Sequence, residues 1–111
     1  MNGPRDTTTN GGMDHSAADR HTRILDAIAN AYEFPGYYPV VVIARSGLDF
    51  EATLMASLAA QQGESPYRVT ERASRRGNYR SYRVELYVED PPAAIAGKEW
   101  LSQLDGVLFV I

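Results

Sequence analysis

The pattern of apolar and polar residues predicts one helix followed by a strand that is apolar on both sides. Residues 16–33 place Ile24 and Ile28 on one helical stripe, and Pro35 ends the helix because the residue before a proline is pushed out of the α region. Residues 37–44 (YYPVVVIA) then form a run rich in β-branched residues. Such a run is typical of a central strand, covered by neighbours on both sides.

Two further helices are marked by their ends. Ser46 and Asp49 have the spacing of a capping box, and the helix that follows reaches Gly63, a natural residue for a helix C-terminus. Asp90 and Pro91 open a later helix, with the aspartate as N-cap and the proline at the first helical position. The chain between and after these helices therefore contains the remaining strands.

Residues 67–89 alternate in polarity around a Gly77-Asn78 turn, which predicts a long β-hairpin. The apolar run 107–111 predicts a last strand. The residues of the hairpin that share the core-facing side are Tyr82, Val84, Leu86 and Val88.

This order predicts an α+β fold, a ferredoxin-like βαββαβ sandwich. Its four-stranded antiparallel sheet has the strand order 4-1-3-2, with two helices on one face and the other face open. Residues 1–15 are mostly Gly, Asn, Thr and Asp with almost nothing to bury, so we predict a disordered tail. Residues 16–111 form a single domain, in which the helix 16–33 precedes the core of residues 37–111.

Composition excludes several classes of function. The chain of 111 residues contains no cysteine, and therefore no disulfide or thiolate zinc site. Both histidines, His15 and His21, lie in or near the predicted tail, and no nucleophile-elbow, P-loop or dinucleotide motif is present. We therefore expect a protein that is not an enzyme, with no catalytic residue, metal or cofactor. Without an apolar run of membrane length or a signal peptide, a cytoplasmic location is the default expectation.

Basic residues are concentrated in the hairpin of a chain whose net charge is −3. Six of the eleven lysine and arginine residues lie there: Arg68, Arg72, Arg75, Arg76, Arg80 and Arg83. Together with Tyr79 and Tyr87 on the open face, they suit a phosphate, a carboxylate or another anionic partner. The same charges also fit a second interpretation, in which they protect an edge strand from aggregation.

The turn length decides how these arginines pair. A two-residue Gly77-Asn78 turn sets Arg72 opposite Arg83 and Arg68 opposite Tyr87, and like charges directly opposite are unfavourable. A loop two residues longer sets Arg68 near Glu85 and keeps the same faces. Both registers stay open on the sequence alone.

The hairpin turn also carries a family likeness. The segment Ser74-Arg-Arg-Gly-Asn-Tyr-Arg-Ser81 and the earlier Glu33-Phe-Pro resemble the signatures of the YbeD-like family, small bacterial proteins of unknown function. The likeness covers residues 33–111 and implies a ferredoxin-like fold similar to that of ACT domains, which sense small molecules. It implies no catalytic residue. The motif positions that we interpret as structural are Ser74, Gly77, Asn78 and Ser81.

We therefore predict a regulatory or adaptor domain that binds an unknown protein or anionic ligand through its basic hairpin. One alternative is an RNA-binding module, in which the open sheet face adds Tyr37 or Tyr38 to the hairpin tyrosines. Another is an ACT-like sensor of a small metabolite. The apolar last strand, at an edge of the sheet, is typical of a homodimer contact.

Overall fold

The computed structural model of the chain describes residues 5–46, 49–74 and 76–111, with side chains from residue 17 onward. These ranges fold into three helices and four strands. In chain order they are α1 (Arg5–Ala31), β1 (Gly36–Arg45), α2 (Phe50–Gln62), β2 (Tyr67–Ala73), β3 (Tyr79–Val88), α3 (Pro91–Ser102) and β4 (Val107–Val110). The four strands form one antiparallel sheet in the order β2-β3-β1-β4. The α+β class and the predicted order of strands are thus confirmed.

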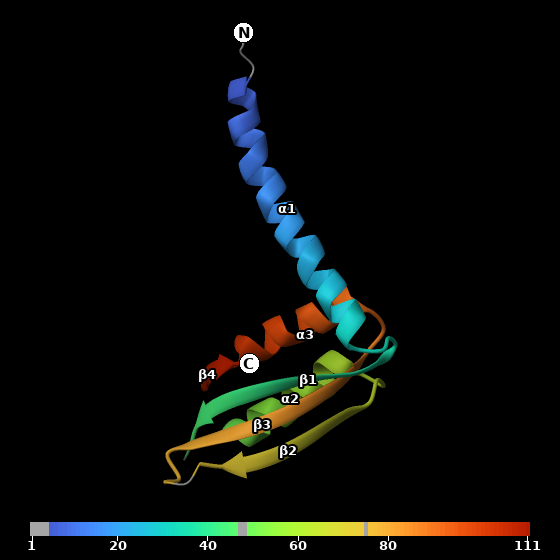
Figure 1. Cartoon of the computed structure of the whole chain (residues 1–111). Coiled ribbons are helices and arrows are strands. Elements are labelled where there is room, and N and C mark those ends of the chain that lie inside the picture. The colour runs from blue at the N-terminus through green and yellow to red at the C-terminus, as the bar shows by residue number, and fades with distance from the viewer. Residues whose placement is uncertain (1–4, 47–48, 75) are drawn as a thin grey trace.

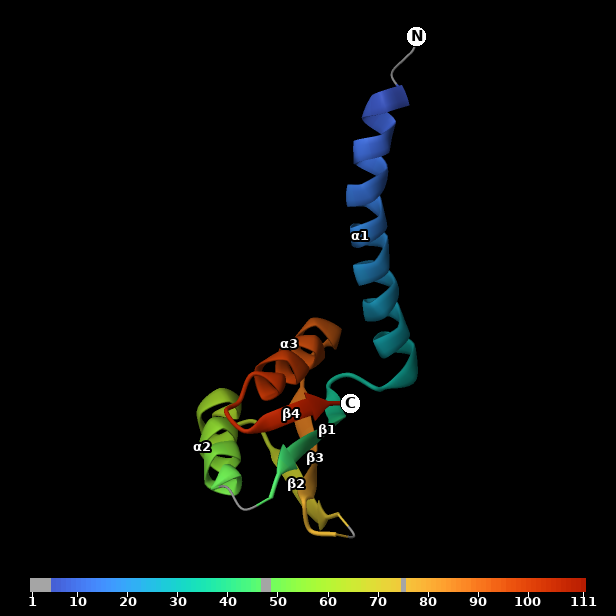
Figure 2. The same ribbon diagram turned by 90° about the vertical axis from the view of Figure 1, so that its left-hand side faces the viewer.

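Helices α2 and α3 lie on one face of the sheet and leave the other face open, as Figures 1 and 2 show. Alternation along the strands turns every second side chain toward these helices. On β3 the four inward residues predicted from the sequence are all buried. The core is completed by residues from both helices and from β1: Phe50, Leu54, Leu58, Ala94, Leu101, Val40, Val42 and Ala44.

The N-terminal cap predicted from the sequence is observed in α3 but not in α2. The Asp90 carboxylate accepts a hydrogen bond of 3.0 Å from the Ala93 N–H, which confirms the predicted cap of α3. The predicted capping box at Ser46 is wrong. Helix α2 begins after Asp49, which makes no side-chain capping bond, and the Ser46 N–H instead donates to the Asn78 carbonyl across the sheet, at 3.0 Å.

Helix α1 begins at Arg5, whereas the sequence predicts a start at Ser16, so residues 5–15 of the predicted disordered tail are helical in the structure. The helix projects away from the body and approaches it only near its C-terminal end (Figure 1). Ile28 packs against the core, while Ile24, one turn earlier, is 51% exposed. Within the described ranges, no helix has the length and apolarity needed to cross a lipid bilayer.

Deleting residues 1–15 is expected to leave the melting temperature unchanged, because this segment has almost nothing to bury and helices stabilised by no packing are marginal in water. Hydrogen exchange on the full chain should show unprotected amides over the same residues. A fall of several degrees on deletion would show instead that the segment contributes to the folded domain.

Candidate functional site

The hairpin of β2 and β3 is an antiparallel pair closed by a turn of four positions between Ser74 and Tyr79. The Ser74 N–H donates to the Tyr79 carbonyl at 2.8 Å, and the Tyr79 N–H donates to the Ser74 hydroxyl at 3.1 Å. Gly77 has the positive φ that the turn requires, 76°. The two-residue Gly77-Asn78 turn is therefore wrong, and the longer loop is the one that forms.

The register that follows keeps the arginines apart. Arg68 lies opposite Glu85 and Arg72 lies opposite Ser81. The shorter turn would have set Arg72 directly opposite Arg83. In the observed register Arg83 lies opposite Thr70 and is a diagonal neighbour of Arg72, so the directly opposed pair is avoided. Among the described residues of the two strands, no arginine therefore lies directly opposite another arginine.

Four arginines project from the open face of the sheet. Alternation along the strands places Arg68 and Arg72 of β2, Arg83 of β3 and Arg45 of β1 on this face. Among the described strand residues there, the one acid is Glu85, whose carboxylate lies 3.9 Å from the Arg83 guanidinium. The open face is therefore basic, although the whole chain is acidic.

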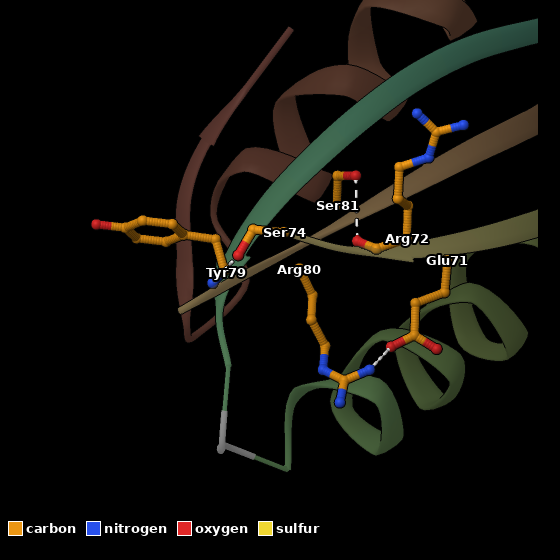
Figure 3. A network of polar contacts seen from close by, with 6 residues as sticks. All are labelled: Glu71, Arg72, Ser74, Tyr79, Arg80 and Ser81. Atoms are coloured by element: carbon orange, nitrogen blue, oxygen red, sulfur yellow. Dashed lines mark hydrogen bonds and ion pairs between the residues drawn. The ribbon is translucent and has the colours of Figure 1, made fainter. Parts of the chain in front are cut away.

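Arg80 belongs to the other face. Its guanidinium forms an ion pair with Glu71, and both side chains point toward α2 while Arg72 extends to the opposite side (Figure 3). The hydrogen bond and the charge of Glu71 raise the pKa of Arg80 above its ordinary value. Arg76 is exposed in the turn, and Arg75 lies outside the described residues. The six arginines thus do not form one cluster.

An aromatic pair lies at one end of the basic face. The rings of Tyr37 on β1 and Tyr87 on β3 meet edge to face, with centroids 5.3 Å apart. The Arg68 guanidinium carbon lies 3.9 Å from the centre of the Tyr37 ring, a cation–π contact. Tyr38 instead faces inward and packs against Tyr32. The sequence left open which of the two tyrosines joins the site, because β1 is apolar on both sides.

The other end of the face carries a shallow cavity of about 450 Å³ beside the hairpin turn. Its lining residues are Arg45, Ser46, Gly77, Asn78 and Tyr79. Tyr79 is 47% exposed here, far along β3 from Tyr87. Arg45 was missed by the sequence analysis. The available signal was its charge, because an arginine at the end of an apolar strand favours the face that is exposed to solvent.

The serines of the motif make structural hydrogen bonds. Each hydroxyl bonds to a backbone atom on the other side of the hairpin. The Ser74 hydroxyl closes the turn, and the Ser81 hydroxyl donates to the Arg72 carbonyl of the neighbouring strand at 3.4 Å (Figure 3). Over the described residues, no group of acidic or histidine side chains is arranged to hold a metal ion.

Tyr82 makes the stability of the folded chain depend on pH in the alkaline range. Its side chain is buried against Phe50, and burial, together with the nearby carboxylates of Glu71 and Glu51, raises its pKa. A phenol whose pKa is higher in the folded state contributes stability up to its unfolded pKa near 10, and loses it as pH rises through the folded value.

We therefore expect the free energy of unfolding to fall with increasing pH above about 10, and to fall less steeply in Tyr82→Phe. Urea unfolding at a series of alkaline pH values measures both slopes. Equal slopes for the two proteins would show that another group causes the loss.

Comparison with known proteins gives a family match. A protein-family model described as "Protein of unknown function (DUF493)" matches residues 29–111, which include the whole sheet, α2 and α3. Neither the curated proteins nor the solved structures contain a match to the chain. The matched region also contains all four arginines of the open face.

Proposed function

The chain belongs to the DUF493 family of proteins of unknown function, and we propose that it is a regulatory or adaptor domain, not an enzyme, which binds an anionic partner on its open sheet face. We infer that the family is the YbeD-like group that the hairpin motif resembles, with a ferredoxin-like fold. The observation that carries the proposal is the placement of Arg45, Arg68, Arg72 and Arg83 on one uncovered face, where Glu85 is the one acid among the described strand residues.

Within the residues that the structure describes, the lack of strong internal ion pairs at these guanidinium groups supports the binding of an anionic partner. Among the described residues, Arg45, Arg68 and Arg72 form no ion pair, and Arg83 has only the distant contact with Glu85. An arginine fork can make two parallel hydrogen bonds with a carboxylate or a phosphate, which a lysine cannot. The face therefore offers donors that an anionic partner can use without first breaking an internal salt bridge.

Single-stranded RNA is the second candidate, because Tyr37 and Tyr87 lie on the two central strands, where modules of this topology stack bases. Two observations favour a different anion. The edge-to-face packing of the rings and the guanidinium over Tyr37 occupy surfaces that a base would need. The net charge of −3 also opposes nonspecific attraction to nucleic acid.

Reversing two charges on the open face tests the proposal. The double variant Arg72→Glu/Arg83→Glu is expected to fold normally, since both side chains are exposed, and to lose its partner in affinity purification from cells at low salt. The matched control is Arg20→Glu/Arg23→Glu, which makes the same charge change on the exposed side of α1.

The control should recover the partner at the level of the original chain. Equal recovery by all three proteins would contradict the proposal and leave edge protection as the role of the arginines. A titration with single-stranded RNA at low salt separates the two candidate anions. Arg80→Glu is a poor probe, because it also breaks the ion pair with Glu71.

A further inference from the structure

The open face is apolar along β1 and β4. Alternation turns every second residue of β1 outward, and the register sets Phe109 of β4 beside Ile43. Ile111 exchanges two backbone hydrogen bonds with Val41, of 2.8 and 3.3 Å. We call this set the apolar stripe. It consists of Tyr37, Pro39, Val41, Ile43, Phe109 and Ile111.

The stripe is exposed where it reaches β4. Phe109 is 54% exposed and Ile111 is 66% exposed, although both are large apolar side chains. Helices α2 and α3 cover the inward face alone (Figure 2). The stripe therefore has no cover within the described part of the chain. Its β1 residues are half-buried and its β4 end is exposed, and exposed apolar surface of this kind marks an interaction site.

The arginines run alongside the stripe. Arg83 of β3 is the direct neighbour of Val41, and Arg68 and Arg72 lie one strand further out. Neighbouring strands are about 4.8 Å apart, so the basic row and the apolar stripe form two parallel bands on one surface. A partner that contacts both bands must place an apolar surface on the stripe and a neighbouring row of acidic groups on the arginines.

We propose that the open face docks an amphipathic helix of a partner protein, with an apolar side on the stripe and a flanking row of carboxylates on the arginines. This deepens the proposed function and rests on it. Complementarity of charge selects the occupant: a nucleic acid would satisfy the arginines and leave the stripe uncovered, whereas an apolar helix without acids would bury the guanidinium groups unpaired.

The geometry sets the length of the helix. From Tyr37 to Ile43 the stripe spans six residue steps, about 20 Å at 3.3 Å for each residue of a strand. A helix rises 1.5 Å for each residue, so roughly 13 residues match that span. The inward face of the same sheet is already covered in this way, since α2 has 13 residues and α3 has 12.

Selection from a library of random 16-residue peptides displayed on phage tests the proposal without assuming a sequence. The enriched peptides are expected to combine apolar residues at helical spacing with aspartate or glutamate next to them. The affinity of a selected peptide should fall about tenfold or more in Arg72→Glu/Arg83→Glu and again in Phe109→Ser/Ile111→Ser. Arg20→Glu/Arg23→Glu should bind unchanged.

Each other outcome overturns the inference in a distinguishable way. Peptides that are acidic without an apolar pattern, and insensitive to Phe109→Ser/Ile111→Ser, would overturn the amphipathic helix and leave the proposed function standing. Peptides insensitive to the arginine variant would overturn both. No enrichment, or a dimer of the chain in sedimentation that the Phe109→Ser/Ile111→Ser variant dissociates, would show that a peptide helix is not the occupant.

Discussion

Replacing Gly97 with valine is expected to lower the free energy of unfolding by roughly 3 kcal/mol, although a helix interior ordinarily favours other residues over glycine. Gly97 is buried where α3 crosses β3. A β-carbon placed on it would lie 2.5 Å from the Leu86 Cδ1, and Leu86 is fully buried, so its side chain has little room to move. Urea unfolding of the variant measures the loss.

Alanine at the same position separates packing from helix propensity. Gly97→Ala gains about 1 kcal/mol of helix propensity and meets an overpacking cost of about 1–3 kcal/mol, so we expect a net loss. Leu86→Ala alone should cost about 2–5 kcal/mol. In that background the contact is gone, and Gly97→Ala should become stabilising. Additive effects of the two substitutions would contradict the close approach of α3 to the sheet.

Much of the fold could be predicted because several sequence patterns are compatible with only one arrangement. Strict alternation on β3 gave its buried face, and the Asp90-Pro91 pair gave the start of α3. The order of strands followed because the apolar run 37–44 needs a neighbour on both sides. In each case a change in the interpretation would have buried a polar group or exposed an apolar one.

The site was harder to predict because several arrangements satisfy the same pattern. A slip of two residues in the hairpin keeps every side chain on its face, so alternation cannot distinguish a turn of two positions from one of four. The choice between Tyr37 and Tyr38 was open for a different reason: β1 is apolar on both sides, so alternation does not show which of its faces is the inward one. Arg80, in contrast, lies two residues before Tyr82 and therefore shares its inward face, so its separation from the open face could be predicted from the sequence.

The arrangement of charge gives the sheet two edges of different character. The β2 edge carries arginines that discourage pairing with another sheet, and the β4 edge carries Leu108, which is 43% exposed, and no charged residue. Strand β4 is also the shortest of the four. Its attachment to β1 therefore decides whether Phe109 is held on the open face.

The turn that leads into β4 controls this attachment. Gly106 has a φ of +97°, and a β-carbon there would lie 3.1 Å from the Phe50 ring. Gly106→Ala is therefore expected to lower the free energy of unfolding by about 1–3 kcal/mol. Gly77→Ala is the matched control, because Gly77 also has a positive φ, +76°, and no contact of the added carbon within 4 Å is found among the described residues.

In the control, backbone strain alone should lower the free energy of unfolding, by about 1–2 kcal/mol, so the difference between the two variants isolates the contact with Phe50. Hydrogen exchange then tests whether the loss of stability includes a weaker attachment of β4 to β1. The Val41 N–H donates to the Ile111 carbonyl, and it should exchange faster in Gly106→Ala and at the original rate in Gly77→Ala. The same loosening should weaken any partner that rests on Phe109. Equal stability losses with no change at Val41 would show that the Gly106 turn does not hold β4 in place.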